Sequence, residues 1–282
     1  RQQMATLDTT GEYPTTLYYT DTGGSGRPIV LIHGWPASGQ SWQQIADPLV
    51  AAGHRVVAYD RRGFGRSGQP EGGYDYDTFA DDLDTLLTRL DLVDVALAGF
   101  SMGGGEVARY IARHGTARVT AAVFVAAIPP CLDATLPDNP EGGFTPQAAA
   151  EMQVALRADP ESFLTGFLTN FYSVPVDSGS ELKVDRDRIE AAIRVARQAS
   201  LTALAESIEL WLTDFRGDLG LIRMPTLVIH GAGDQIVPIQ ASGARMPQYV
   251  PGARLISVPD GPHGLLHSHP GQVSAALLDF LD

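Results

Sequence analysis

Residues 93–105 have the sequence Val-Asp-Val-Ala-Leu-Ala-Gly-Phe-Ser-Met-Gly-Gly-Gly, and this stretch decides the fold. A strand of small apolar residues is followed by Gly-x-Ser-x-Gly and then by a helical pattern. Gly99 and Gly103 flank Ser101, and we expect a Cβ atom at either position to clash with backbone in a tight turn. Such a turn exposes the Ser101 hydroxyl at the end of the strand, near the positive end of the helix dipole. The stretch predicts a nucleophilic serine.

Two later strand ends supply the groups that a nucleophilic serine needs. Asp234 follows the apolar run Thr226–His230, and His263 lies on a Gly/Pro-rich loop after the run Arg254–Val258. We interpret His263 as the general base whose Nε2 takes the Ser101 proton, and Asp234 as the acid that fixes its tautomer. Gly-x-Ser-x-Gly also occurs by chance, so the order serine, aspartate, histidine along the chain carries the prediction.

Two other acidic residues compete with Asp234 for the role of the acid. Asp260 lies three residues before His263, where we expect it to shape the turn. Asp60 stands, like Asp234, at the end of an apolar run. The prediction keeps Asp234, with Asp60 and Asp260 as rivals.

The backbone N–H groups of Trp35 and Met102 are the predicted donors to the oxyanion. Met102 lies at the start of the helix after Ser101, where backbone N–H groups are free. The second donor should come from His33-Gly34-Trp35-Pro36, which follows another apolar run. Pro36 has no N–H, so we assign Trp35 and expect its indole to wall the acyl pocket.

Short apolar runs alternate with helical patterns along most of the chain, which predicts a parallel sheet with helices on both faces. The expected strands are Ile29–Ile32, Arg55–Tyr59, Val93–Phe100, Ala121–Ala127, Thr226–His230 and Arg254–Val258, with an edge hairpin at Leu17–Thr20 beside Gly23-Gly24. The expected helices are Ser41–Ala52, Tyr76–Leu90, Met102–His114, Gln240–Tyr249 and Gly271–Leu281.

No strand pattern is found between Pro129-Pro130 and about Phe215. Helices are expected instead at Pro146–Arg157, Pro160–Phe171, Arg186–Gln198 and Leu201–Thr213, two of which begin with a proline. The pattern therefore predicts a core of residues 1–129 and 216–282 and a helical cap of residues 130–215. The aromatic residues of this region either line a pocket or form the core of the cap: Phe144, Phe163, Phe167, Phe171, Tyr172, Trp211 and Phe215.

The composition excludes several classes of partner. A net charge of -13 and a pI near 4.8 argue against nucleic acid, because phosphate binding needs clustered Lys and Arg. No apolar run has membrane-spanning length, the stretch Arg1–Thr10 lacks the pattern of a secretion signal, and Cys131 has no second cysteine to bond. The expectation is a cytoplasmic protein without a membrane partner. A homo-oligomer stays open.

Two cofactor-binding interpretations fail on their context. Residues 63–68 match Gly-x-Gly-x-x-Gly but are followed by a loop, not by a helix. Residues 103–108 match the variant that ends in alanine, but the next strand lacks the acidic residue that would hold a ribose. A phosphate-binding loop is excluded because the only lysine, Lys183, follows no glycine-rich turn.

No metal site is expected. His263, His267 and His269 do not have a metal-ligand spacing, and we expect the last two to be solvated or to cap a helix. The arginines Arg61, Arg62 and Arg66 are expected on a solvated, ion-paired loop rather than in an anion site.

Several stretches together resemble one family. They are His33-Gly34-Trp35-Pro36, residues 59–67 (Tyr-Asp-Arg-Arg-Gly-Phe-Gly-Arg-Ser), residues 99–110, Gly231-Ala232-Gly233-Asp234, and Gly261-Pro262-His263-Gly264 with His269-Pro270. The chain resembles, over nearly its whole length, the cofactor-free bacterial haloperoxidases, which are also described as perhydrolases, arylesterases and, in some members, lactamases.

The resemblance implies the α/β-hydrolase fold, a mostly parallel eight-stranded sheet flanked by helices and carrying a helical cap. It also implies hydrolysis of small carboxylic esters through an acyl-enzyme. When hydrogen peroxide replaces water, the product is a peracid that oxidises halide in solution, so neither haem nor vanadium is needed. The implied partners are a small ester or carboxylic acid and hydrogen peroxide.

Other functions remain open beside this one. Ser101 at the nucleophile position argues against relatives that use aspartate to cleave carbon–halogen or epoxide bonds. Lactonases, lactamases and carbon–carbon bond hydrolases keep the serine and are alternatives. A small-ligand receptor with a vestigial triad is the non-enzymatic alternative.

Overall fold

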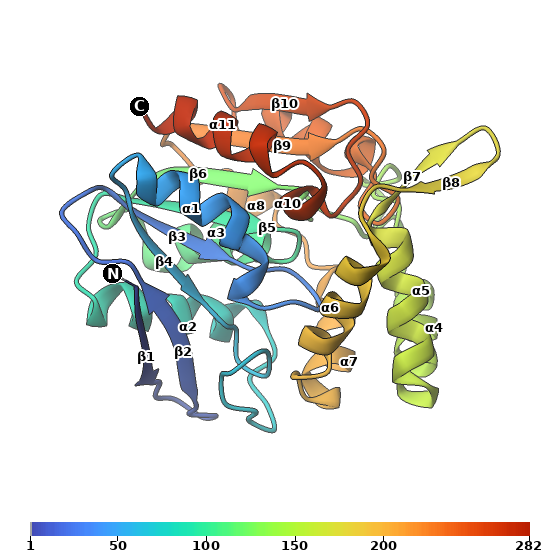
Figure 1. The fold of residues 1–282 in the computed structure, drawn as a ribbon, viewed down its shortest axis with the longest axis horizontal. Helices are drawn as coiled ribbons and strands as arrows, with labels where there is room; N and C mark the ends of the chain where they lie inside the picture. The colour runs from blue at the N-terminus through green and yellow to red at the C-terminus, as the bar shows by residue number, and fades with distance from the viewer. Residues whose placement is uncertain (1) are drawn as a thin grey trace.

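A computed structural model describes residues 2–282 and contains an eight-stranded sheet in the order β1-β2-β4-β3-β5-β6-β9-β10 (Figure 1). β2 pairs antiparallel with β1 and β4, and all other neighbours are parallel. The predicted fold class is confirmed. The strands are β1 (Gln3–Asp8), β2 (Thr16–Asp21), β3 (Pro28–Ile32), β4 (Arg55–Tyr59), β5 (Val95–Phe100), β6 (Val119–Val125), β9 (Thr226–Gly231) and β10 (Arg254–Val258).

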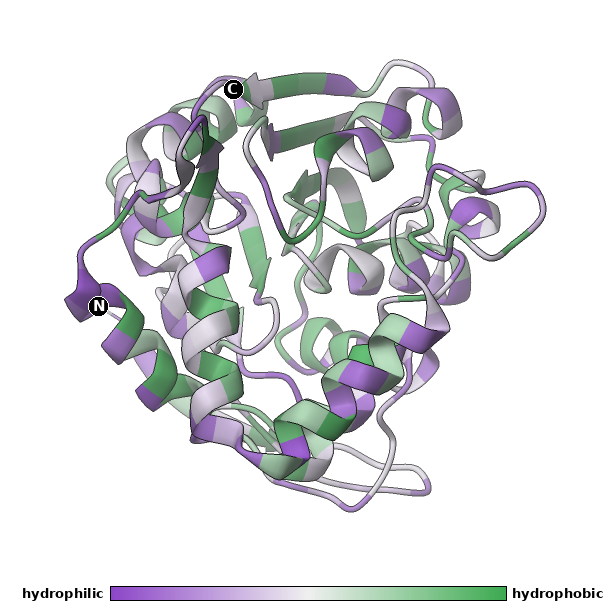
Figure 2. Ribbon diagram, turned by 90° about the vertical axis from the view of Figure 1, so that its right-hand side faces the viewer, coloured by the Kyte–Doolittle hydropathy of each residue, from purple (hydrophilic) through white to green (hydrophobic). Residues whose placement is uncertain are grey.

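Helices cover both faces of this sheet. Every residue of β3 and β5 is buried, as expected for a strand with a helix on each side. On one face lie α1 (Gln43–Ala51), α10 (Leu265–Ser268) and α11 (Pro270–Leu281), and on the other lie α2 (Tyr76–Arg89), α3 (Gly103–His114) and α8 (Arg216–Leu219). Apolar residues gather on the inner strands and on the inward sides of the helices (Figure 2). None of the helices in residues 2–282 is long and apolar enough to cross a membrane.

The N-terminal hairpin differs from the prediction. β2 pairs with β1 upstream and with β4, so it lies inside the sheet, and β1 forms the edge. The pattern of β1 is hard to detect because Leu7 is its only buried side chain. Gly23 and Gly24 do adopt positive φ angles, but they lie in the connection from β2 to β3 rather than in the hairpin turn.

The segment between β6 and β9 contains the four expected helices: α4 (Pro146–Ala158), α5 (Pro160–Phe171), α6 (Arg186–Ala196) and α7 (Leu201–Leu210). The prediction that it holds no strand is wrong. β7 (Ser173–Val176) and β8 (Gly179–Leu182) form a hairpin that projects from the molecule (Figure 1). Its four-residue strands are mostly exposed, so they lack the apolar pattern of a core strand. The division at residues 130 and 215 stays a prediction.

The predicted helix Gln240–Tyr249 is broken into three short pieces. Two 3-10 turns, Ile239–Ala241 and Gly243–Arg245, precede α9 (Met246–Tyr249). Ser242 leaves the helical region with φ -141° and ψ -80°. This break brings Gly243 against the ring of His230, where any larger residue would collide.

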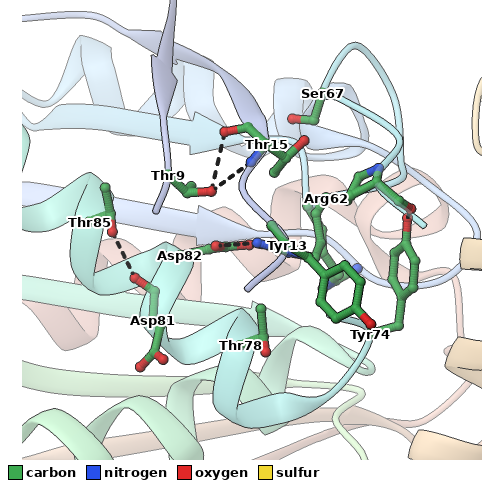
Figure 3. A network of polar contacts seen from close by, with 12 residues as sticks. Thr9, Tyr13, Thr15, Arg62, Ser67, Tyr74, Thr78, Asp81, Asp82 and Thr85 are labelled. Atoms are coloured by element: carbon green, nitrogen blue, oxygen red, sulfur yellow. Dashed lines mark hydrogen bonds and ion pairs between the residues drawn. The ribbon is translucent and has the colours of Figure 1, made fainter. Parts of the chain in front are cut away.

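Arg61 and Arg62 are not solvated, which corrects the prediction. Both are 1% exposed. Arg62 donates two hydrogen bonds to Asp82 at 2.7 and 2.9 Å and reaches the carbonyl of Tyr13 at 2.9 Å (Figure 3). Arg66 is exposed as expected and lies over the ring of Tyr18.

Candidate active site

Ser101 lies in a tight turn between β5 and α3, with a φ of +55°. A Cβ atom on Gly99 would collide with the backbone of Gly103, and one on Gly103 would lie 2.6 Å from the carbonyl oxygen of Ile32. The expected glycine requirement is confirmed at both positions. The close packing of the backbone thus holds Ser101 at the carboxyl end of the strand.

The side chains of Ser101, His263 and Asp234 form a continuous chain of hydrogen bonds. Ser101 Oγ lies 2.9 Å from His263 Nε2, and His263 Nδ1 lies 2.7 Å from Asp234 Oδ2. All three residues are at most 6% exposed. The rings of Phe100 and Phe171 pack against the His263 imidazole at centroid distances of 5.1 and 4.8 Å. The three residues that the sequence singles out therefore meet in the geometry that proton transfer from the serine requires.

The Asp234 carboxylate is surrounded by donors. Its Oδ1 accepts hydrogen bonds from the N–H groups of Ile236 and Val237 at 2.9 and 2.8 Å. Burial alone would raise the pKa of Asp234, but the charge on His263 and hydrogen bonds from His263 and His230 lower it to about 2. Asp234 is thus held as an anion beside the imidazole.

The backbone N–H groups of Trp35 and Met102 donate no hydrogen bond within residues 2–282, and the same is true of their neighbours Gly34 and Gly103. The peptide unit that carries the Met102 N–H is fixed because its carbonyl, that of Ser101, accepts from the N–H groups of Gly104 and Ile128 at 3.0 and 3.2 Å. The Trp35 side chain is fixed because its Nε1 donates to the Leu204 carbonyl at 3.0 Å. Both residues lie where the sequence predicts oxyanion donors.

A cavity of about 230 Å³ opens on Ser101, and Trp35 contributes to its wall. Its aromatic lining residues are Trp35, Phe144, Phe167 and Trp211, and its aliphatic ones are Ile128, Leu132, Met152, Ile236, Val237 and Pro238. Asn170 and Gln235 are polar, and no lining residue is charged. Of the predicted cap aromatics, Phe144, Phe167 and Trp211 line this pocket. Phe215 instead packs on Tyr76 beside α3.

The rival acids lie elsewhere. Asp60 accepts hydrogen bonds from the N–H groups of Gly39 and Arg66, at 2.7 and 2.9 Å. The exposed Asp260 contacts His269 at 3.0 Å. Neither reaches His263, so the geometry favours Asp234.

The histidines considered as a metal set have separate partners. His263 contacts Asp234, His267 Nδ1 lies 2.9 Å from the Tyr172 hydroxyl, and His269 contacts Asp260. Within residues 2–282 no group of three or more His, Cys, Asp or Glu side chains is arranged to hold a metal ion.

A buried polar network behind the site was missed by the sequence analysis. Arg61 donates to Glu106 on α3 at 2.5 Å and to the carbonyl of His33 at 2.5 Å. His33 Nε2 accepts from the Arg61 N–H at 2.9 Å. Burial and then the charge of Arg61 hold the pKa of His33 well below its usual value, so the ring is neutral. The network ties the Trp35 loop to the helix after Ser101.

The sequence analysis also missed His230, which stands four positions before Asp234 in the chain and is fully buried. Its Nε2 lies 3.2 Å from Asp234 Oδ2. The only signal in the sequence is the spacing His-x-x-x-Asp, which by itself does not distinguish a core histidine from one at the site.

Comparison with known proteins agrees with this arrangement. The family described as "alpha/beta hydrolase fold" matches residues 27–270. A non-heme chloroperoxidase of Kitasatospora aureofaciens is 39% identical over 94% of this chain and 96% of its own, and a bifunctional esterase/perhydrolase of Acinetobacter calcoaceticus is 32% identical over 94% and 95%.

A solved structure is similar throughout. The crystal structure of a bromoperoxidase from Bacillus anthracis superimposes with a TM-score of 0.92 at 41% identity, covering 100% of this chain and 99% of the other. The chain is therefore an enzyme of the α/β-hydrolase family, and within that family it belongs with the non-heme haloperoxidases.

Proposed function

We propose that this enzyme hydrolyses small, uncharged carboxylic esters through an acyl-enzyme on Ser101. The observation that carries the proposal is the hydrogen-bonded chain from Ser101 through His263 to Asp234, beneath two unpaired backbone N–H groups. The neutral, aromatic lining of the cavity supports an uncharged acyl group, because an anionic one would find no cation there.

In the acylation step, Ser101 Oγ attacks the ester carbonyl while His263 Nε2 accepts the hydroxyl proton. The N–H groups of Trp35 and Met102 stabilise the negative oxygen of the tetrahedral intermediate. The carbon–oxygen bond to the alcohol then breaks, and His263 returns the proton to the leaving alkoxide. Asp234 stabilises the imidazolium throughout.

In the deacylation step, His263 takes a proton from water while the water oxygen attacks the acyl carbon. The bond to Ser101 Oγ then breaks, His263 returns the proton to Oγ, and the carboxylic acid is released. We propose that hydrogen peroxide can replace water in this step. The product is then a peracid, which oxidises bromide to hypobromous acid in solution and is itself reduced to the carboxylate. The relative from Acinetobacter, named as an esterase and perhydrolase, supports this extension.

The first test is a panel of p-nitrophenyl esters of increasing acyl length. We expect turnover of short and aryl esters, and a loss of about 10⁶-fold in kcat in Ser101→Ala, as for other serine triads. Ser101→Ala with near wild-type activity would refute the nucleophile. Turnover of lactones or carbon–carbon substrates in preference to esters would support those alternatives, and binding without turnover would support a receptor.

The second test adds acetate, hydrogen peroxide and bromide, and follows bromination of a dye. We expect bromination that requires acetate and disappears in Ser101→Ala. Ester hydrolysis without acetate-dependent bromination would refute the perhydrolase extension and leave the esterase proposal standing.

A further inference from the structure

A second imidazole shares the carboxylate oxygen on which the proposed base depends. His230 Nε2 lies 3.2 Å from Asp234 Oδ2, the same oxygen that lies 2.7 Å from His263 Nδ1. His230 lies in β9 and is fully buried, as is the Asp234 side chain. The proposed mechanism assigns no step to His230.

The surroundings of His230 fix its tautomer. Nε2 also lies 2.8 Å from the carbonyl oxygen of Val237. Both neighbours of Nε2 are acceptors, so Nε2 carries the proton. Its N–H donates to the Val237 carbonyl, and the positive end of the same N–H dipole lies close to Asp234 Oδ2. Nδ1 has no hydrogen-bond partner within residues 2–282 and lies against Gly243, where a Cβ atom would be 2.6 Å away.

This packing holds the ring at some expense to stability. A buried nitrogen without a partner destabilises the fold, and an apolar side chain in its place would avoid that penalty. A Cβ atom on Gly243 would lie 2.6 Å from Nδ1 and 2.9 Å from Cγ of His230, so the glycine is what leaves room for the ring. The side chain is therefore poised to direct one N–H group, that of Nε2, toward Val237 and Asp234.

With His230 included, Asp234 has four polar neighbours. Ile236 and Val237 donate to Oδ1, His263 Nδ1 lies 2.7 Å from Oδ2, and His230 Nε2, which donates to Val237, lies 3.2 Å from the same Oδ2. A donor at Oδ2 withdraws negative charge from the atom that stabilises the His263 imidazolium. His230 thus favours the neutral form of His263, which is the form that can accept the Ser101 proton.

Other titratable groups on the surrounding elements are engaged elsewhere. His267 on α10 contacts Tyr172 at the end of α5, and Arg188 on α6 faces both. Asp260 contacts His269 and Lys183. Ser101 is neutral, so Asp234 and His230 are the polar neighbours that bias the protonation of His263.

We propose that His230 is a positioning residue that sets the basicity of His263 by sharing Oδ2 of Asp234. The inference rests on the proposed function, because it concerns the base of that reaction. Without the His230 donor, Asp234 holds the His263 proton more tightly, and a higher pH is needed to obtain the active, neutral imidazole.

The test is the pH profile of kcat/KM for p-nitrophenyl acetate in three variants. The acid limb of this profile reports the protonation of the base in the free enzyme. His230→Leu and His230→Asn remove the donor at Oδ2, the asparagine because its amide is too short to reach. We expect both to move the acid limb upward by about 0.5–1 pH unit. His230→Gln places an amide N–H near the position of Nε2 and should restore the wild-type profile.

The outcomes separate this role from a structural one. An acid limb that stays in place or moves downward in both His230→Leu and His230→Asn overturns the proposal, even where kcat falls. Asp82→Asn, far from the site, serves as the variant in which stability alone changes. If the wild-type enzyme hydrolyses no ester, the proposed function fails separately. The coupling is then measured as the His263 titration by NMR, with a higher midpoint expected in His230→Asn and an unchanged one contradicting it.

Discussion

At the residue scale, Asp234 differs from the buried Asp60 in the groups that contact its carboxylate. Asp60 bonds to two backbone N–H groups, and burial raises its pKa, whereas Asp234 bonds to an imidazole as well and its pKa falls to about 2. A carboxylate that remains charged in the interior can orient a histidine and stabilise its cation.

Replacing Asp234 with asparagine should lower kcat by about 10⁴-fold. The amide oxygen would keep accepting from the N–H groups of Ile236 and Val237, and the amide N–H would then donate to His263 Nδ1, which favours the inactive tautomer. Steady-state kinetics with p-nitrophenyl acetate measure this. Asp60→Asn is the matched control and should retain kcat within about tenfold, since Asp60 bonds Gly39 and Arg66 rather than the base. A larger loss in Asp60→Asn than in Asp234→Asn would reassign the acid.

At the element scale, the turn from β5 to α3 depends on close backbone contact. A Cβ atom at Gly103 would lie 2.6 Å from the carbonyl oxygen of Ile32 on β3, and neither backbone can retreat without breaking the sheet. This contact, rather than conformational freedom, is what requires glycine here.

Gly103→Ala should therefore lower the free energy of unfolding by about 3 kcal/mol through overpacking. Gly217→Ala is the control, because a Cβ atom there meets nothing within 4 Å and α8 is an ordinary helix. Urea denaturation followed by circular dichroism measures both. Equal stability of the two variants would contradict the steric interpretation.

A second prediction at this scale concerns the two buried ion pairs. Arg61 pairs with Glu106 and also holds the His33 carbonyl at the Trp35 loop, whereas Arg62 pairs with Asp82 and holds the N-terminal segment. Glu106→Gln and Asp82→Asn should each cost about 3 kcal/mol of stability, because each leaves a buried guanidinium without its counter-charge.

The two variants should differ in activity. Glu106→Gln should also lower kcat about tenfold by loosening the Trp35 loop, whose N–H is a proposed oxyanion donor, and Asp82→Asn should keep kcat within about twofold. Comparing kcat with the unfolding midpoint in urea for each variant separates the effects. An equal kcat loss in both would mean that the network acts through stability alone.

At the scale of the whole molecule, histidines whose pKa is lowered in the fold couple stability to pH. Burial, and then the charge of Arg188, lower the pKa of His267 to about 4, below the ordinary value near 6.5 that it regains on unfolding. Between these values the unfolded chain binds the proton and the folded chain does not. Stability is therefore complete above about pH 6.5 and falls as the pH drops toward 4.

We expect the free energy of unfolding to decrease between pH 7 and pH 4, by about 3 kcal/mol at most from His267 alone. His267→Gln should flatten this decrease, because the variant has no proton to take up on unfolding. Part of the slope should remain, since His33 is also held neutral by burial. Urea titrations at a series of pH values test this, and an identical slope in both proteins would contradict it.

Those parts of the fold and of the candidate site that neighbouring residues encode could be predicted from the sequence. The strand, the turn and the helix around Ser101 are encoded by neighbouring residues, so the tight turn at Ser101 and its glycines were predictable. The exposed hairpin Ser173–Leu182 was not, because strands that bury few side chains carry no apolar pattern.

The arginines show what could not be predicted, because their partners lie far away in the chain. Nothing in residues 59–67 distinguishes Arg61, which bonds to Glu106, from the exposed Arg66, because the partner of each comes from a distant element. The same holds for His230, because its contacts with Asp234 and Val237 depend on the side to which its ring points from β9.

The sequence by itself predicted the parallel core, the turn that presents Ser101, and Asp234 and His263 as its partners, since periodicity and turn chemistry are properties of adjacent residues. The tertiary structure decided which N–H groups remain unpaired, which charges are buried, and that two imidazoles meet one carboxylate. Those depend on distances between segments that are far apart in the chain, and only the packing of the sheet and its helices sets such distances.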